Sequence, residues 1–374
     1  LFAHKSGSGE NKAIPEILSS FSLLFGVGFF AFAALGIWLA YPILRLLHTT
    51  GDTIRLAGDY LRIIFAGIPF LAVYNVYSAA LRGIGDSRAP FLAILFSSAV
   101  NVVLDILFVA CLHWGVKGAA AATVISQAAM TAFLILYAVA KHPLLRFCPG
   151  GRLLYGNALE QGFRLGIPPM IQSSVSAFGS LLLQNFMNGF GTQTVAAITT
   201  AYRVDTIILL PIINLGSGIS TIVARNHGAG EEGRAKRVLA VGTAMMAAVS
   251  LFLTILVIPT GGRVIAMFGV GAGAVGIGQD FFQRIACFYV VFGLATAVRG
   301  YLEGIGDVLY SSIAGIVSLI SRILASYGMA AVFGNMVIAY AEAFSWGVLL
   351  ALYLARMGGR RYRMGGPIDS PATP

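Results

Sequence analysis

An aspartate interrupts one of the most apolar stretches of the chain. Asp105 lies within "SSAVNVVLDILFVA", and Asn101 precedes it by four residues, so on a helix both side chains project from the same face. A carboxylate with a neighbouring amide oxygen suits a hard, oxygen-preferring cation such as Na⁺. The same carboxylate can instead hold a proton, and competition between the two states is a basis for ion coupling. A structural role, in which Asp105 hydrogen-bonds neighbouring helices, is the alternative.

The second half of the chain carries charges of both signs in equally apolar surroundings. Arg322 lies in "SLISRILASYG", and its candidate counter-ions are Glu303 and Glu342. Arg299 and Arg284 also lie close by in the sequence. An unpaired arginine in hydrocarbon is costly, whereas a paired one can stabilise the packing of helices. We therefore expect a structural ion-pair network here, with contact to substrate as the alternative.

Three further polar positions could line a cavity. Arg203 and Asp205 occur together in "TAYRVDTIILLP", where a local salt bridge fits the spacing as well as a cavity lining does. Gln172 lies in "PPMIQSSVSAFGS" among several serines. These side chains could hydrogen-bond a substrate, although serine also serves the close packing of membrane helices.

The elements that must position these residues are membrane-spanning helices. Hydrophobic residues make up 57% of the chain and charged residues 11%, whereas a soluble domain has about 25% charged residues. The run from Ile17 to Leu47 has no charge before Arg45, and about 20 apolar residues suffice to cross a bilayer as a helix. A helix also satisfies every backbone hydrogen bond within one segment. The sequence thus predicts an all-α polytopic membrane protein.

Ten apolar runs are candidate spans. They lie near residues 18–47, 57–81, 89–113, 117–140, 160–188, 194–223, 236–260, 278–302, 309–333 and 336–356. The net charge of +10 comes from basic residues that cluster between these runs, and far more of them fall on one side of the membrane than on the other. The richer side is cytoplasmic by the positive-inside rule, which predicts that both ends of the chain face the cytosol. This location of the charges argues against a nucleic-acid partner.

Two segments read almost alike, "LRGIGDSRAP" from Leu81 and "LEGIGDVLYS" from Leu302. The offset of 221 recurs elsewhere, since "AHKSGSGE" aligns with "ARNHGAGE" and Val116 falls on Val337. One constant offset predicts an internal duplication, which is typical of transporter folds with two half-bundles around a central site. The Gly-Ile-Gly-Asp motif itself is expected at a helix end, where glycine permits a tight reversal and the aspartate caps the next helix.

The same offset leaves two spans of the second copy, near 160–188 and 194–223, without counterparts in the first. The chain also opens on Leu1 rather than on Met. We therefore expect the intact protein to have twelve spans, six in each lobe, with a genuine ten-helix chain as the alternative. The corresponding domains are an N-lobe remnant at 1–140, a cytoplasmic linker at 141–159, a C-lobe at 160–356 and a cytoplasmic tail at 357–374.

Five segments together resemble the multidrug and toxic compound extrusion (MATE) transporters. They are "YSAALRGIGDSRAP", "NVVLDILFV", "GAAAATVISQ", "STIVARNHGAG" and "AEAFSW". The resemblance extends over nearly the whole chain, with the motifs in matching order. It implies two six-helix lobes around a central cavity that alternates between inward and outward access. Influx of H⁺ or Na⁺ would drive the efflux of small organic, often cationic, compounds.

The resemblance also implies roles for individual residues. Asn101 and Asp105 match the cation site of the first lobe, and Thr123 matches its hydroxyl partner. The family pattern calls in addition for an aspartate on the first helix, which this chain lacks. The second lobe departs from the pattern, because the offset of 221 places Arg322 at the position of Asn101 and Ser326 at that of Asp105. We therefore expect coupling in the first lobe, with any Na⁺ held by Asp105 and Asn101.

Three function classes remain. The first is a secondary active exporter with H⁺ or Na⁺ as coupling ion and no other cofactor, and the second is a flippase for lipid-linked oligosaccharides from the same superfamily. The third, a membrane-embedded enzyme, is not expected, because the five histidines lie in loops or at helix ends. The three cysteines show no metal-ligand spacing and are expected as buried thiols. We expect a monomer in the lipid bilayer of a bacterial inner membrane, with small organic cations as substrates.

Overall fold

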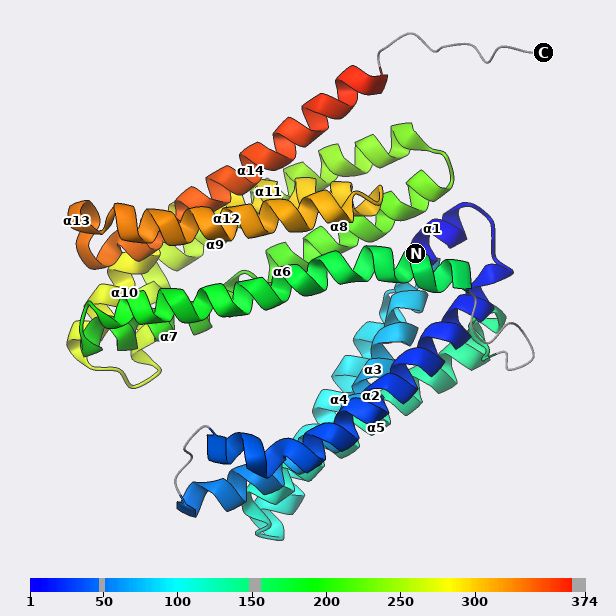
Figure 1. Ribbon diagram of the computed structural model, residues 1–374, viewed down its shortest axis with the longest axis horizontal. Coiled ribbons are helices and arrows are strands. Elements are labelled where there is room, and N and C mark those ends of the chain that lie inside the picture. The colour runs from blue at the N-terminus through cyan, green and yellow to red at the C-terminus, as the bar shows by residue number, and fades with distance from the viewer. Residues whose placement is uncertain (47–50, 148–155, 365–374) are drawn as a thin grey trace. The chain divides into compact units, whose positions relative to one another are not determined.

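The computed structural model describes residues 1–46, 51–147 and 156–364, and every regular element in these ranges is a helix (Figure 1). The α-helices are α1 (Phe2–Gly7), α2 (Ala13–Leu46), α3 (Gly51–Ile84), α4 (Arg88–Asp105), α5 (Gly115–Lys141), α6 (Gly156–Asn188), α7 (Thr192–Ile208), α8 (Leu210–Gly228), α9 (Glu232–Ala266), α10 (Ala272–Ile285), α11 (Tyr289–Gly304), α12 (Val308–Gly328), α13 (Ala330–Phe333) and α14 (Val337–Met364). A π-helix, Ile106–Cys111, continues α4. The predicted all-α class is confirmed.

Eight helices in the described ranges are long and apolar enough to cross a membrane, or nine if α7 and α8 count as one bent span. Each of the ten predicted spans coincides with a helix or a helix pair. The span predicted at 160–188 is the 33-residue α6, which is not among the eight. The span predicted at 194–223 is broken, because α7 and α8 meet at an angle of 41°. The chain is a multi-pass membrane protein.

The chain divides into two compact units, unit 1 from Leu1 to Gly162 and unit 2 from Phe163 to Pro374. Within the described residues, unit 1 contains α1 to α5 and unit 2 contains most of α6 together with α7 to α14. At the offset of 221, α1 corresponds to the last turns of α8, and α2 corresponds to α9. The predicted linker at 141–159 and tail at 357–374 fall partly outside the described residues, as do His48 and Cys148.

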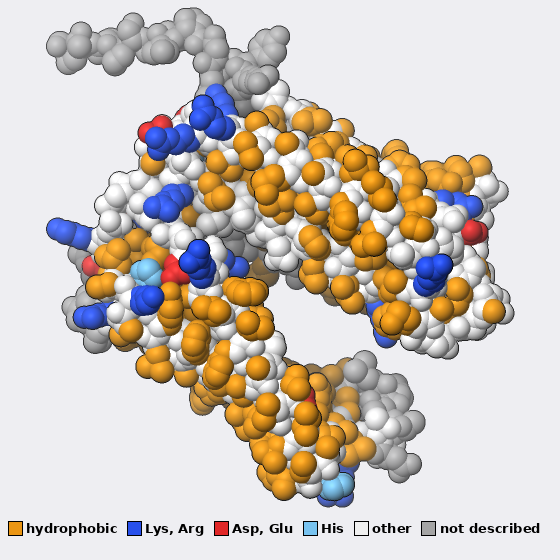
Figure 2. Space-filling view, turned by 180° about the vertical axis from the view of Figure 1, so that it is seen from behind, with side chains coloured by type: hydrophobic (Ala, Val, Ile, Leu, Met, Phe, Trp, Pro, Cys, Tyr) orange, Lys and Arg blue, Asp and Glu red, His pale blue; other side chains and the backbone are white. Residues whose placement is uncertain are grey.

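Each unit buries small and aliphatic side chains between its helices and leaves large apolar side chains outside. Ile17, Leu81 and Leu134 are fully buried in unit 1, whereas Phe30 is 69% and Trp38 71% exposed. On the face seen in Figure 2, hydrophobic side chains cover the length of the helices, and lysines and arginines lie mostly near their ends. This pattern suits a surface that contacts lipid tails along its middle and water at its ends. Among the exposed residues are Cys111 and Cys287, so the expectation of buried thiols is wrong for both.

The repeated Gly-Ile-Gly-Asp motif forms the same turn in both units. Gly85 and Gly306 have φ angles of 98° and 88°, a left-handed conformation that favours glycine. The N–H of Asp86 donates to the carbonyl of Leu81 at 2.9 Å, and the N–H of Asp307 donates to that of Leu302 at 2.8 Å. These backbone hydrogen bonds close the ends of α3 and α11 in the same way. The motif therefore repeats because the turn repeats.

The aspartate of the turn joins it to other helices. Asp86 accepts hydrogen bonds from the N–H groups of Arg88 and Ala89 at the start of α4, and its second oxygen lies 3.0 Å from His142 Nε2. Partial burial alone would raise the pKa of Asp86, but the hydrogen bonds from His142 and from the N–H of Ala89 outweigh it and hold the pKa below its usual value. The ionised carboxylate is therefore the form that the turn stabilises at neutral pH.

The constant offset fails at the last helix of each unit. The hydroxyl of Ser97 on α4 donates to the carbonyl of Ser126 on α5 at 3.0 Å, and the hydroxyl of Ser318 on α12 donates to that of Ser345 on α14 at 2.7 Å. Residues 97 and 318 differ by 221, but residues 126 and 345 differ by 219. The predicted equivalence of Val116 and Val337 is therefore wrong, because two fewer residues connect the last two helices of unit 2.

We expect Gly300→Ala to destabilise unit 2. A Cβ at Gly300 of α11 would lie 2.6 Å from the backbone oxygen of Gly216 on α8, so the two helices would have to separate. Overpacking of this kind costs about 1–3 kcal/mol, which should lower the melting temperature of the detergent-solubilised protein. Gly218→Ala on α8 is the matched control, because a Cβ there would meet no atom within 4 Å and alanine favours the helix. Equal melting temperatures for the two variants would contradict the close approach of α8 and α11.

Candidate functional site

Asp105 is the last residue of α4 and directly precedes the π-helix Ile106–Cys111. Short π-helical segments are rare and occur frequently at functional sites. Oδ1 of Asp105 is buried and has no hydrogen-bond partner among the described residues, and the same holds for Nδ2 of Asn101. A buried polar atom without a partner costs free energy, so a polar or charged ligand bound beside this pair would be stabilised.

Thr123 lies at the level of Asn101 on the neighbouring helix. The hydrogen bond between Ser97 and Ser126 fixes the register of α4 against the antiparallel α5. Asn101 lies one turn after Ser97 on α4 and Thr123 lies one turn before Ser126 on α5, so both are one turn closer to the segment that connects the two helices. The Thr123 hydroxyl donates its hydrogen to the carbonyl of Ala119 at 3.0 Å. Its oxygen lone pairs therefore remain available, which suits a cation or another hydrogen-bond donor.

Unit 2 contains an ion pair at the equivalent level. Nη2 of Arg322 on α12 lies 3.0 Å from Oε2 of Glu342 on α14. Both residues are one turn from the hydrogen bond between Ser318 and Ser345, which we call the serine bridge of unit 2; the hydrogen bond between Ser97 and Ser126 is the serine bridge of unit 1. Nη2 also donates to the hydroxyl of Tyr202 on α7 at 2.7 Å. Glu342 is 8% exposed, so this is a buried pair within the membrane-spanning part of the unit.

The repeat relates the two sites residue by residue. Arg322 takes the place of Asn101, and with the offset of 219 on the last helix Glu342 takes the place of Thr123. The equivalent levels of unit 1 lie on the packed helix pair α4 and α5, which the hydrogen bond from Ser97 to Ser126 joins. Unit 2 thus has the cationic side chain of Arg322 at this level, whereas in unit 1 the carboxylate oxygen of Asp105 and the amide of Asn101 have no partner among the described residues.

The other charged residues singled out from the sequence pair locally. Arg299 lies 2.6 Å from Glu303, which also accepts a hydrogen bond from Ser311 at 3.0 Å. Arg284 lies 3.6 Å from Asp280, one turn earlier on α10. Glu303 is therefore not the partner of Arg322. The Arg322 pair and the Arg299 pair are separate.

Arg203 and Asp205 do not form a salt bridge, although only one residue separates them. Asp205 is 4% exposed, and its Oδ1 accepts a hydrogen bond from the hydroxyl of Tyr289 at 2.5 Å. Arg203 is exposed and has no ion-pair or hydrogen-bond partner within the described part of the chain. Gln172 packs against Gly315 of α12, and its Oε1 is buried without a hydrogen-bond partner among the same residues.

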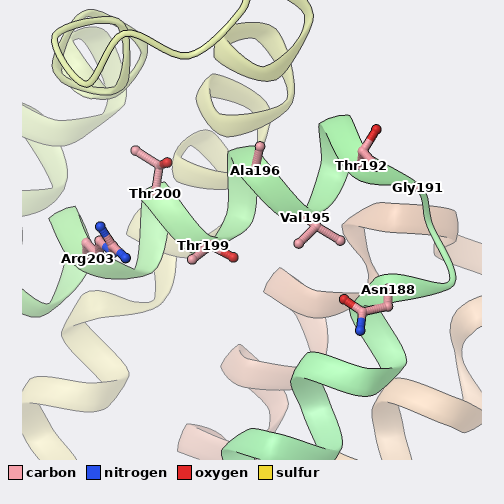
Figure 3. Close-up of a pocket in the computed structure, with 8 residues that line it drawn as sticks. All are labelled: Asn188, Gly191, Thr192, Val195, Ala196, Thr199, Thr200 and Arg203. Atoms are coloured by element: carbon pink, nitrogen blue, oxygen red, sulfur yellow. The ribbon is translucent and has the colours of Figure 1, made fainter. Parts of the chain in front are cut away.

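A cavity of about 570 Å³ follows α7 from its first turn to Arg203 (Figure 3). Its lining residues share one stripe of the helix and the turn before it, and they are Asn188, Gly191, Thr192, Val195, Ala196, Thr199, Thr200 and Arg203. Sequence reasoning identified only Arg203 among them. The signal that could have revealed the others is the spacing of threonine and alanine by three and four residues in "TQTVAAITTAYR".

Comparison with known proteins yields one consistent family. A model of the MatE family matches residues 1–107 and 168–328. The chain is similar to the "Probable multidrug resistance protein YpnP" of Bacillus subtilis, with 31% identity over 320 residues, 85% of this chain and 71% of that protein. It is also similar to the "Multidrug export protein MepA" of Staphylococcus saprophyticus, with 24% identity over 293 residues, 78% of this chain and 65% of that one.

Solved structures share the fold. An outward-facing multidrug resistance MATE family transporter of the MOP superfamily matches with a TM-score of 0.91 and 18% identity, covering 98% of this chain and 83% of that chain. A MOP superfamily transporter from Pyrococcus furiosus matches with a TM-score of 0.87 and 18% identity, covering 98% and 85%. These likenesses extend over both units of the chain.

Loss of one partner of the Arg322–Glu342 pair should destabilise the protein more than loss of both. Arg322→Met leaves Glu342 buried and unpaired, which typically costs about 3–5 kcal/mol. The double variant Arg322→Met with Glu342→Leu removes both charges and should recover most of the melting temperature in detergent. Arg284→Met is the control, since its partner Asp280 lies at an exposed position and such pairs contribute about 0–1 kcal/mol. A double variant as unstable as Arg322→Met would show that the pair is not the source of the effect.

Proposed function

The chain belongs to the MatE family, and from this premise we propose that it is a secondary active multidrug efflux transporter. It exchanges H⁺ or Na⁺ for small organic compounds by alternating access. The names of its relatives, a multidrug resistance protein and a multidrug export protein, support export of chemically varied molecules. Coupling to an ion gradient is our inference from the site in unit 1.

The observation that carries the proposal is the unpaired carboxylate oxygen of Asp105 within a membrane span. An ionisable side chain at this depth is costly and marks ion or substrate pathways by default. A structural acid would lie in an ion pair, as Glu342 does with Arg322 at 3.0 Å, whereas no cation among the described residues forms an ion pair with Asp105. Asp105 instead lies beside the equally unpaired amide of Asn101, at the start of a π-helix. Both features fit a site that is emptied and refilled in each cycle.

The two coupling ions would use this site differently. A proton neutralises the Asp105 carboxylate and removes the cost of a buried charge. A sodium ion would take oxygen ligands from Asp105, from the Thr123 hydroxyl and from Asn101, whose amide presents its oxygen after a 180° flip. Either ion leaves unit 1 uncharged at this position when bound and negatively charged when released. This change of charge would couple binding of the ion to the change between inward-facing and outward-facing conformations.

A lipid-linked oligosaccharide flippase is not favoured. The cavity on α7 has one basic side chain, Arg203, among its eight lining residues, whereas a pyrophosphate headgroup would require several cations. An enzymatic role is not proposed, because the relatives are named as a multidrug resistance protein and a multidrug export protein. We further propose that both chain ends face the cytosol, because basic residues dominate the segments on that side. The relatives from Bacillus subtilis and Staphylococcus saprophyticus support a bacterial inner membrane, and we propose a monomer there.

Asp105→Asn in the full-length protein should abolish gradient-driven efflux of a cationic dye such as ethidium. The protein is reconstituted into vesicles, and a proton gradient and a sodium gradient are imposed separately. Asparagine cannot exchange a proton or carry the charge that attracts Na⁺, so efflux should fall to the rate of vesicles without protein. Asp280→Asn is the control, because Asp280 is an exposed acid that pairs only with Arg284 on its own helix. Efflux that persists in Asp105→Asn under the gradient that drives the wild type would refute the site.

Substitution of Thr123 distinguishes sodium coupling from proton coupling. Thr123→Val removes one oxygen ligand, which is worth roughly 1 kcal/mol. If Na⁺ drives transport, the sodium concentration for half-maximal efflux should rise several-fold, and Thr123→Ser should restore it. If protons drive transport, both variants should retain the pH dependence of the wild type. A sodium-driven transporter with unchanged sodium dependence in Thr123→Val would exclude Thr123 from the site.

A further inference from the structure

Arg203 is a cation without a counter-ion inside a membrane-spanning helix pair. It lies eleven residues after the start of α7 at Thr192, about 16 Å along the helix axis at 1.5 Å per residue. The bent pair α7 and α8 runs from Thr192 to Gly228, about 55 Å along the helix axis, whereas the hydrocarbon core of a bilayer is about 30 Å thick. A core centred on this pair begins about 12 Å from Thr192, so Arg203 lies just inside its boundary on the side where α7 begins. An arginine at this depth normally faces water or pairs with an acid, and here no acid in the described residues pairs with it.

The nearest acid in the sequence is committed elsewhere. Asp205 is buried on the other side of α7, where the hydroxyl of Tyr289 donates to it. Glu342 pairs with Arg322, and Glu303 pairs with Arg299. The cavity that Arg203 faces is therefore electropositive, because its lining contains no aspartate or glutamate.

The rest of the lining supplies neutral hydrogen-bonding groups beside this charge. Oγ1 of Thr199, one turn before Arg203, is buried and has no hydrogen-bond partner in the described part of the chain. Thr200, Thr192 and Asn188 add further polar side chains to the lining. In Figure 3 Thr192 and Thr200 project from the edge of α7 opposite to Thr199, and Asn188 is at the end of α6. Val195 and Ala196 lie between them and give the cavity an apolar wall.

We propose that this cavity on α7 binds the carboxylate of organic substrates, with Arg203 as the anion-binding residue and Thr199 as a hydrogen-bond donor. The inference rests on the proposed export function and names a substrate class for it, zwitterionic and acidic organic molecules. A guanidinium presents two parallel N–H groups that match the two oxygens of a carboxylate. The Thr199 hydroxyl donates to one of the same oxygens, and the apolar wall contacts the hydrocarbon part of the molecule. A purely cationic compound gains nothing from Arg203.

Two dyes that differ by one methyl group test this assignment. Rhodamine 110 carries a free carboxylate, and rhodamine 123 is its methyl ester, so the second dye keeps the ring cation but lacks the anion. Binding of each dye to the purified full-length protein is measured by fluorescence anisotropy in detergent. We expect Arg203→Gln to weaken the binding of rhodamine 110 about tenfold, the worth of a charge-assisted hydrogen bond. Binding of rhodamine 123 should change less than about twofold, since the ester makes no such bond.

Further variants separate charge from structure. Arg203→Lys keeps the charge without the planar fork and should retain part of the rhodamine 110 binding. Thr199→Val should weaken rhodamine 110 selectively and by less than Arg203→Gln. Arg164→Gln removes an exposed arginine of α6 outside the cavity lining and should leave both dyes unchanged. Benzoate, a small carboxylate, should displace rhodamine 110 from the wild type, which tests the site even if a variant fails to fold.

The outcomes distinguish this inference from the proposed function. If Arg203→Gln weakens both dyes equally or neither, or if benzoate fails to displace rhodamine 110, the carboxylate site is wrong even where gradient-driven efflux of rhodamine 123 is intact. If binding of rhodamine 110 depends on Arg203 but no gradient drives efflux of either dye, the site stands and the export function fails.

A second arm distinguishes a transported carboxylate from a lipid phosphate. The binding measurement is repeated in nanodiscs of phosphatidylcholine alone and of phosphatidylcholine with phosphatidylglycerol. Equal affinity for rhodamine 110 in both supports a site for soluble carboxylates. Loss of that affinity in the anionic lipid, with rhodamine 123 unaffected, would overturn the assignment in favour of a lipid headgroup.

Discussion

A charge within a bilayer must find a partner, and this constraint sorts the polar residues of the chain into two kinds. Arg322 with Glu342 and Arg299 with Glu303 are paired at 3.0 and 2.6 Å. Asp105 and Arg203 are not paired with any described residue. The paired residues neutralise each other within unit 2 and need no mobile counter-ion. Each unpaired residue carries a cost that a mobile ligand of opposite charge would remove.

The duplication makes the contrast between paired and unpaired charges informative, because the same backbone arrangement contains a paired charge in unit 2 and an unpaired one in unit 1. The turns at Gly85 and Gly306 and the serine bridges to Ser126 and Ser345 are the same backbone features in the two units. One turn from the bridge, unit 2 has an arginine and a glutamate where unit 1 has an amide and a hydroxyl. In unit 2 the guanidinium of Arg322 supplies a permanent cation at this level, where unit 1 has the neutral side chain of Asn101. Divergence after duplication would let one unit bind and release an ion while the other keeps a permanent charge pair.

The sequence predicted the helices well, because long apolar runs leave few alternatives in a bilayer. The predicted spans did not show where the helices break. The π-helix after Asp105 depends on local backbone geometry that composition does not encode. The bend between α7 and α8 does have a sequence signal, Pro211 in the first turn of α8. The sequence also leaves the partner of Arg322 open between Glu303 and Glu342, and the constant offset hides the two-residue difference before the last helix. That difference becomes visible only when Ser126 and Ser345 are found in the same hydrogen bond.

Sequence proximity was misleading at Arg203 and Asp205 for a simple geometric reason. Residues two apart on a helix are separated by about 200° around its axis, so they face opposite sides. Asp205 turns into the core of unit 2, and Arg203 turns into the cavity. This separation has a consequence for energetics if the exported molecule carries a carboxylate. Exchange of one proton for a monocation moves no net charge, whereas exchange for a zwitterion moves one positive charge inward. The membrane potential then contributes about 2.3 kcal/mol per 100 mV to each cycle. An arginine that selects acidic substrates would in this way also select those whose export the potential drives.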